Sequence, residues 1–143
     1  MLKTIHPLLS PELLTVLAAM GHGDELAIVD ANFPAASMAR LLIRSSATST
    51  QVLEAVLTLL PLDDFVESPV TVMKVVGAPD EIPETVREYQ ATVDKAEGKP
   101  VKVERIDRFA FYERSRAAFA VVATNETRFY GNVIVKKGVV RPK

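Results

Sequence analysis

The chain has 143 residues, 48% of them hydrophobic and 24% charged, with a formal net charge of −1 and no cysteine. This length suits one packed domain, and the composition excludes a chain that is disordered throughout. A nearly neutral chain has no basic field for nucleic acid, and without cysteine it has no disulfide, thiolate metal site or cysteine nucleophile.

The first predicted element is a helix that begins at Ser10 and Pro11. Serine is a good N-cap, and proline suits the first helical position. Apolar residues at helical spacing continue to Met20, and Gly21 stands where a C-terminal cap belongs. His22 therefore falls just past the end of this helix.

Short apolar segments follow. The run Leu26–Val29 predicts a strand buried on both faces, and Asp30 ends it. Residues 32–36 predict a loop, because Pro34 disfavours helix at the residue before it. A second short strand is predicted at 41–43, and Thr48 opens a capping box for the next helix.

The middle of the chain alternates strand and helix. The β-branched run 70–76 predicts a buried strand, and Pro83 starts a helix that Gly98 ends. Residues 101–106 alternate as a strand with one polar face, and residues 109–119 predict a helix for which Asp107 is a plausible N-cap.

Two strands are predicted near the end of the chain, at 120–123 and 133–135. The polar residues 125–127 turn the chain between them, and this short connection favours their pairing with each other. Helices that alternate with short apolar strands indicate a single-domain, layered α/β fold. The last connection has no helical crossover, so the sheet is predicted to be mixed.

His22 is the leading candidate for chemistry. Glycines flank it, and Asp30 follows a strand later, so an imidazole that titrates near neutral pH would lie beside a carboxylate. The alternative is a histidine that only caps a helix end. Asp30 can likewise be a turn residue, but ligands of α/β sheets gather at the carboxyl ends of strands.

Polar residues late in the chain form a second group of candidates. Arg108 follows its N-cap and would stand at a helix entrance, whereas Tyr112 could belong to an ordinary solvated helix face. Tyr130 and Asn132 offer hydrogen-bond donors and acceptors to a polar ligand, and Gly131 lets the backbone approach it closely. The alternative for these three residues is a turn or bulge.

Several kinds of site are not indicated. Two histidines without metal-ligand spacing predict no metal, and no glycine-rich phosphate loop or serine nucleophile elbow is present. No apolar run approaches the ~20 residues that span a membrane, so we expect a cytoplasmic protein without membrane or nucleic-acid partners. The surviving residue types suit an uncharged, hydroxyl-rich ligand such as a sugar.

Six segments resemble the L-fucose mutarotase family, which belongs to a wider group with the D-ribose pyranases. They lie in the family's order along nearly the whole chain: Leu8–Leu14, Met20–Glu25, Asp30–Pro34, Arg108–Arg114, Tyr130–Asn132 and Lys136–Val139. The resemblance implies a three-layer α/β/α protein that needs no cofactor. It also implies a homo-oligomer, a ring-shaped decamer with active sites near subunit contacts.

The resemblance assigns roles residue by residue. His22 matches the acid–base histidine of the family. Asp30, Arg108 and the run Tyr130–Asn132 match its sugar-binding positions, and Tyr112 is a further candidate without an assigned role. Asn32 departs from the histidine of some family members.

The implied reaction is interconversion of the α and β anomers of L-fucose or a related sugar by ring opening and closing. His22 would move the proton, with Asp30 either orienting His22 or binding sugar hydroxyls. Arg108, Tyr130 and Asn132 would hold the hydroxyls. Three alternatives stay open: a ribose-type pyranase, a non-catalytic monosaccharide-binding oligomer, and a purely structural oligomer.

Overall fold

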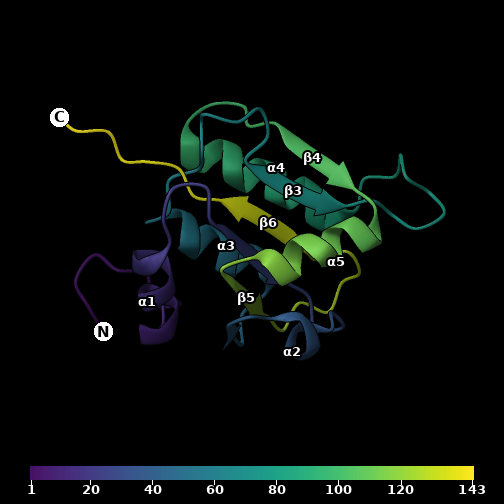
Figure 1. The fold of residues 1–143 in the computed structure, drawn as a ribbon, viewed down its shortest axis with the longest axis horizontal. Coiled ribbons are helices and arrows are strands. Elements are labelled where there is room, and N and C mark those ends of the chain that lie inside the picture. The colour runs from purple at the N-terminus through teal and green to yellow at the C-terminus, as the bar shows by residue number, and fades with distance from the viewer.

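The computed structural model describes residues 1–143 and contains one six-stranded sheet between two layers of helices (Figure 1). The strands are β1 (Glu25–Val29), β2 (Leu42–Arg44), β3 (Val70–Met73), β4 (Val103–Ile106), β5 (Ala120–Ala123) and β6 (Val133–Lys136). The helices are α1 (Pro11–Ala19), α2 (Ala35–Met38), α3 (Ser49–Leu57), α4 (Glu84–Glu97) and α5 (Arg108–Ala117).

The sheet is mixed, as predicted, in the order β2-β5-β1-β6-β3-β4. Strand β6 is antiparallel to both of its neighbours, β1 and β3, and every other pairing is parallel. Strands β1 to β5 therefore all run in one direction. Their carboxyl ends meet at one edge of the sheet, which we call the carboxyl edge, and their amino ends meet at the opposite amino edge.

The predicted pairing of the last two strands is wrong. Strands β5 and β6 flank β1, with Leu26 opposite Ala120 on one side and Val135 on the other. The short connection 124–132 crosses the carboxyl end of β1 instead of forming a hairpin. The amide of Ala31 donates to the carbonyl of Glu126 at 2.8 Å, which ties this connection to the end of β1.

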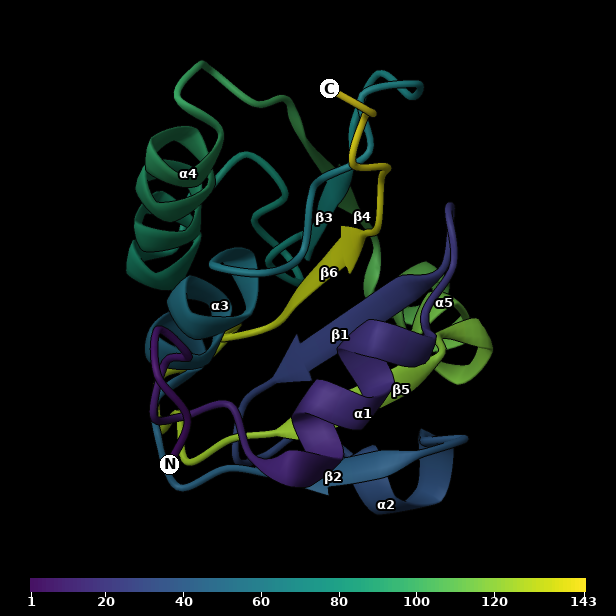
Figure 2. The same ribbon diagram turned by 90° about the vertical axis from the view of Figure 1, so that its left-hand side faces the viewer.

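Alternation along β1 separates two cores. Leu26 and Ile28 belong to the larger core, which α1, α3 and α4 cover, whereas Ala27 and Val29 belong to the smaller core under α2 and α5. Figure 2 shows α3 and α4 on one side of the sheet and α5 on the other. The expected three-layer α/β/α architecture is confirmed.

Most predicted helix ends are confirmed, with local differences. Ser10 and Thr48 cap α1 and α3, and the capping box of Thr48 is complete. The predicted loop 32–36 overlaps the short helix α2, which begins at Ala35 because Pro34 occupies the N-cap position, where it does not interrupt a helical hydrogen bond. The predicted strand 70–76 ends at Met73.

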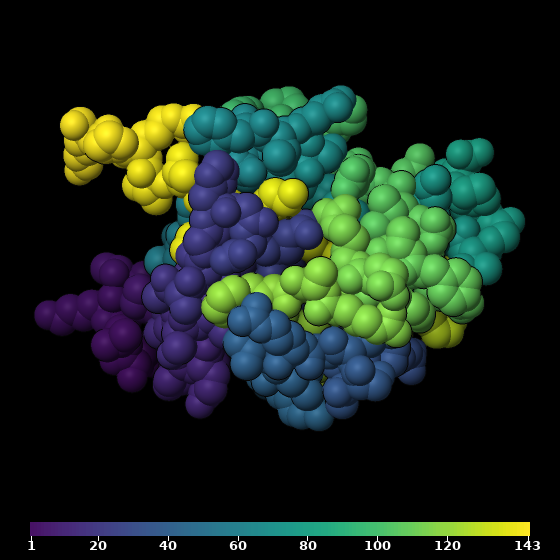
Figure 3. Space-filling view, viewed as in Figure 1, coloured from purple at the N-terminus to yellow at the C-terminus, as the bar shows by residue number.

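Both termini project from the same side of the molecule (Figures 1 and 3). The chain forms no helix of the length and apolar character that a membrane span requires.

Candidate functional site

The polar loops of the chain divide between the two edges of the sheet. Because β1 to β5 are aligned and β6 runs against them, the segments after β1, β3 and β4 and the segment before β6 all lie at the carboxyl edge. This topology brings together Asp30, Arg108 and Tyr130–Asn132, as the sequence predicts. It leaves His22, which precedes β1, at the amino edge.

Asp30 is the centre of the hydrogen bonding at the carboxyl edge. Its side chain is nearly buried, and it accepts from the amides of Asn32 at 3.0 Å and Gly131 at 3.2 Å and from Nδ2 of Asn132 at 3.1 Å. The Asp30 amide in turn donates to Oδ1 of Asn132 at 2.9 Å. Burial raises the pKa of the Asp30 carboxyl, against the lowering effect of these hydrogen bonds.

Gly131 is required by the packing behind Asp30. A Cβ at this position would lie 2.6 Å from Cγ of Glu126 and 3.2 Å from Cβ of Asp30. The glycine therefore allows the loop before β6 to press against the carboxylate. The sequence-based expectation is a close approach of the backbone to a ligand, whereas the close approach seen at Gly131 is to protein side chains.

Tyr130 has a left-handed backbone, with φ of 57°, which is rare for a bulky residue. Its phenolic oxygen accepts a hydrogen bond from the amide of Val76 at 2.9 Å. Because that bond uses a lone pair, the phenolic hydrogen remains available to donate to a ligand.

These side chains surround a cavity of about 290 Å³. It is lined by Asp30, Asn32, Phe33, Met73, Val76, Arg108, Tyr112, Phe129, Tyr130 and Asn132. Arg108 is the first residue of α5, and its guanidinium lies over the Phe109 ring at 4.8 Å. The cavity thus combines a polar wall with an apolar one, as small-molecule sites commonly do.

Tyr112 contributes its ring to this cavity wall. The ring packs edge-on against Phe33, with centroids 5.4 Å apart. Its hydroxyl makes no hydrogen bond within the chain.

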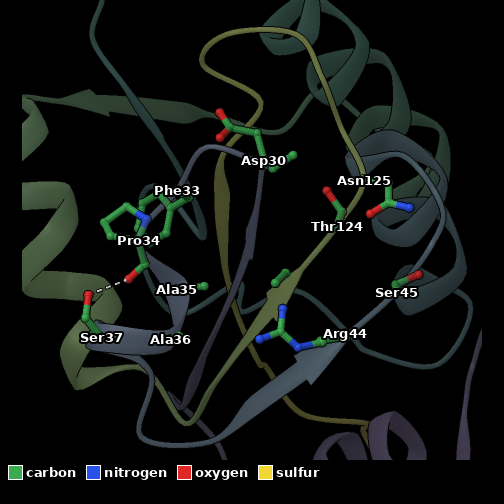
Figure 4. A pocket seen from close by; sticks show the side chains of 12 residues that line it. Asp30, Phe33, Pro34, Ala35, Ala36, Ser37, Arg44, Ser45, Thr124 and Asn125 are labelled. Carbon is green, nitrogen blue, oxygen red and sulfur yellow. Dashed lines mark hydrogen bonds between the residues drawn. The ribbon is translucent and has the colours of Figure 1, made fainter.

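A second cavity, of about 430 Å³, lies on the other side of the loop that follows β1. Figure 4 shows the Arg44 side chain directed into it from β2, with Ser45 and Asn125 on one side and Pro34 on the other. Asp30 and Phe33 line both cavities and so form the wall between them.

His22 lies at the amino edge with a different carboxylate. Its Nε2 is 3.0 Å from Oδ1 of Asp63, and its ring centroid is 5.1 Å from that of Phe65. The imidazole side chain is 44% exposed, whereas Asp63 is only 3% exposed. A carboxylate accepts, so Nε2 carries the hydrogen in this bond, and in the neutral imidazole Nδ1 then carries the lone pair.

The turn that carries His22 is built from its neighbours. Gly23 has a φ of 88°, a left-handed conformation that favours glycine, and the Asp24 carboxylate accepts from the Gly21 amide at 2.7 Å. The end of β6 fixes this turn against the segment of Asp63. The carbonyl of Lys137 accepts from Gly23 at 2.8 Å, and the carbonyl of Lys136 accepts from Asp63 at 3.0 Å.

His22 and Asp30 therefore do not form a pair. Five strand steps separate the start of β1 from Asp30, about 16 Å at the usual rise per residue. The interpretation of Asp30 as the residue that orients His22 is wrong for a single chain, because a buried strand separates them. Asp63 holds that position, and no motif in the sequence marks it.

No group of three or more His, Asp or Glu side chains in the chain lies close enough together to hold a metal ion.

Comparisons with known proteins match nearly the whole chain. The sequence model of the RbsD / FucU transport protein family matches residues 3–140. The chain is 47% identical to the L-fucose mutarotase of Actinobacillus pleuropneumoniae serotype 5b (strain L20), over all of both chains. It is 49% identical to the fucose mutarotase of Homo sapiens, covering 97% of this chain and 94% of the human one.

Solved structures match as well. The fucose mutarotase of Streptococcus pneumoniae in complex with L-fucose superimposes with a TM-score of 0.91 at 42% identity, covering 98% of this chain and all of that one. Bacillus subtilis RbsD complexed with D-ribose has a TM-score of 0.71 at 22% identity, covering 95% and 98%, which shows the shared fold alone.

Proposed function

The chain belongs to the RbsD / FucU family, and we propose that it is an L-fucose mutarotase, an isomerase that interconverts the α and β anomers of this sugar. The observation that carries the proposal is the pair of His22 and Asp63. One imidazole nitrogen is held by a buried carboxylate, and the other is free at the surface to exchange a proton.

The reaction needs only proton transfers. A base takes the proton of the anomeric hydroxyl, the bond between C1 and the ring oxygen breaks with its electron pair on the ring oxygen, and an acid protonates that oxygen. The open aldehyde turns about its C1–C2 bond and closes on its other face by the reverse steps. Nδ1 of His22 supplies the lone pair for one of these transfers.

The cavity at the carboxyl edge supplies the groups that bind sugar. The Tyr130 hydroxyl has a free hydrogen, and Arg108 has no ion pair within the chain, so both can donate to sugar oxygens. Asp30 and Asn132 fix each other and form the polar wall beside them. The methyl group of a 6-deoxy sugar suits the apolar side of the same cavity, formed by Met73 and Val76.

We further propose that two copies of the chain complete each site. His22 of one copy cannot reach the cavity of the same copy, because β1 separates them. Exposed apolar side chains surround both parts: Phe65 beside His22, and Phe109 and Phe129 around the cavity. A contact between opposite edges of two copies is heterologous, and such contacts form a ring when the rotation between copies closes, which is compatible with the ring-shaped decamer that the resemblance implies.

The activity is tested by NMR. Saturating the anomeric proton of α-L-fucose should transfer saturation to the β anomer when the protein is present. D-Ribose in the same assay distinguishes a pyranase, which would exchange pyranose with furanose forms. Transfer no faster than in buffer, for L-fucose and a panel of related aldoses, would contradict the proposal.

The shared site is tested by mixing inactive variants. His22→Ala and Tyr130→Phe should each lose activity. Co-expression should give mixed oligomers, with an intact site wherever His22 of a Tyr130→Phe chain faces Tyr130 of a His22→Ala chain. Random mixing in equal amounts would restore about a quarter of the sites, one half times one half, in heterologous contacts. Mixed oligomers with no restored activity would show that each chain acts alone.

A further inference from the structure

The peptide bond between Tyr130 and Gly131 is held at both of its polar atoms by side chains. Oγ1 of Thr85 donates to the Tyr130 carbonyl at 3.0 Å, and the Asp30 carboxylate accepts from the Gly131 amide at 3.2 Å. Fixing both atoms fixes the plane of the peptide. The plane in turn determines ψ of Tyr130 and the direction in which its side chain leaves the backbone.

Tyr130 needs such support. Its φ of 57° is disfavoured for a residue with a Cβ, and a conformation of this kind persists only where the surroundings impose it. The Asp30 contact belongs to the sugar cavity itself. Thr85 lies outside the cavity. It is the second residue of α4 and is 1% exposed. Its hydroxyl serves no helix cap, and Tyr130 is its hydrogen-bond partner.

The next turn of α4 holds the middle of the same loop, two residues before Tyr130. Glu88, three residues after Thr85, binds the guanidinium of Arg128 at 2.5 and 3.0 Å. Arg128 also binds the buried carboxylate of Glu126, which packs behind Gly131. Thr85 and Glu88 lie on one face of the helix, so α4 contacts the loop at two points one turn apart.

From these contacts we infer that Thr85 is a positioning residue: its hydroxyl holds the Tyr130–Gly131 peptide so that the Tyr130 phenol faces the sugar cavity. The inference rests on the proposed function, in which Tyr130 donates to the sugar. Thr85 itself does not line the cavity. Thr85 acts from helix α4, through the backbone carbonyl of Tyr130, which does line the cavity.

The test compares three substitutions. Thr85→Val keeps the shape of the side chain and removes the hydroxyl, whereas Thr85→Ser keeps the hydroxyl. Thr92→Val is the matched control, because Thr92 lies on the same helix and its Oγ1 donates only to the Glu88 carbonyl within that helix, at 2.8 Å. Thermal unfolding of each variant separates lost stability from lost positioning.

The first readout does not depend on activity. The chain has three tyrosines, so a sample labelled with 13C at tyrosine Cζ gives three ring signals, and Tyr130→Phe identifies the one from Tyr130. Thr85→Val should shift that signal, and Thr85→Ser and Thr92→Val should leave it in place. An unshifted signal in Thr85→Val would overturn the inference, even if the protein proves to have no mutarotase activity.

The second readout is the rate of anomer exchange. We expect Thr85→Val to lower it about 10- to 100-fold, the loss that follows from a misplaced group, and Thr85→Ser to restore it to within about threefold of the native rate. In the Tyr130→Phe background, Thr85→Val should have no further effect. A full effect in that background, or an equal loss in Thr85→Ser, would show that Thr85 does not act through the Tyr130 phenol.

Discussion

The two edges of the sheet are built in different ways. At the carboxyl edge, Asp30 and Asn132 bond to each other through backbone and side chain, and Thr85 holds the neighbouring peptide from another layer. At the amino edge, the imidazole of His22 has one hydrogen bond, to Asp63, and is nearly half exposed.

In the proposed reaction, the two edges meet two different requirements. A cavity that recognises an array of hydroxyls needs its donors and acceptors fixed in advance, and a dense set of internal bonds provides this. A group that exchanges protons needs a free nitrogen and a defined tautomer, and one buried carboxylate is enough for that. Substitutions at the two edges should therefore impair different functions, proton transfer at the amino edge and sugar binding at the carboxyl edge.

Removing the proton-transfer group should have the largest effect. We expect His22→Ala to lower anomer exchange by about 10²–10⁴-fold, the usual contribution of general acid–base catalysis, while L-fucose binding persists. Saturation-transfer NMR measures the rate, and calorimetry measures the binding. His6→Ala is the matched control, since His6 lies near the N-terminus and its ring accepts a hydrogen bond only from the nearby Leu8 amide. An active His22→Ala protein would remove this residue from the mechanism.

Asp63→Asn should have the next largest effect. A carboxamide can donate to Nε2 of His22 and so favour the tautomer with its hydrogen on Nδ1, where the proposed mechanism needs a lone pair. We expect a loss of up to about 10²-fold in exchange and a changed 15N pattern of the His22 ring. Asp64→Asn changes the adjacent aspartate, which is exposed and binds Arg141, and should retain the native rate. Equal losses in both variants would contradict the pairing.

Glycine substitutions compare the two edges by stability. Gly131→Ala would place a Cβ against Glu126 and Asp30, and such overpacking costs about 1–3 kcal/mol. Gly23→Ala has open space around the added Cβ but a left-handed backbone, at a cost of about 1–2 kcal/mol. Urea unfolding measures both. Only Gly131→Ala should also weaken sugar binding, and normal binding in that variant would argue against the cavity as the sugar site.

A fall in pH should lower the free energy of unfolding by a smaller amount, through Glu126 at the carboxyl edge. Hydrogen bonds from Arg128 lower the pKa of Glu126 from 4.5 to about 2. A carboxylate with a depressed pKa stabilises the fold fully above about pH 4.5, and this contribution is lost as the pH falls toward 2. The native chain should therefore lose its stability advantage over Glu126→Gln across this range, as urea midpoints would show. Glu113→Gln, at an exposed pair with Arg116, should change little. A constant advantage across this range would contradict the assignment.

Much of the fold follows from local signals in the sequence. The caps at Ser10 and Thr48 and the stop at Gly98 depend on neighbouring residues, and each appears as predicted. The partners of β6 depend on contacts distant in the chain. A short connection favours a hairpin, but here it crosses the end of β1, which both β5 and β6 flank.

The candidate site shows the same division. Asp30, Arg108 and Tyr130 could be placed together because the carboxyl ends of aligned strands share an edge. The residue beside His22 could not be identified in this way. Asp63 stands in a loop without a motif, and it reaches His22 because the end of β6 holds both segments. No sequence motif marks Thr85 as a positioning residue either, because a buried threonine on a helix resembles any other core residue.

Strand β6 determines a length as well as a pairing. Asn132 precedes β6 at the carboxyl edge. At the amino edge, the carbonyls of Lys136 and Lys137 hold Asp63 and the His22 turn. The four residues of β6 therefore set the distance between the sugar cavity and His22. In the ring of identical copies proposed above, every contact would repeat the same spacing. Inserting two residues into both β6 and β1 would preserve the side-chain alternation of each strand but increase the distance between the two edges by about 7 Å. Each copy could still fold, but the proposed ring would no longer close with His22 at its neighbour's cavity.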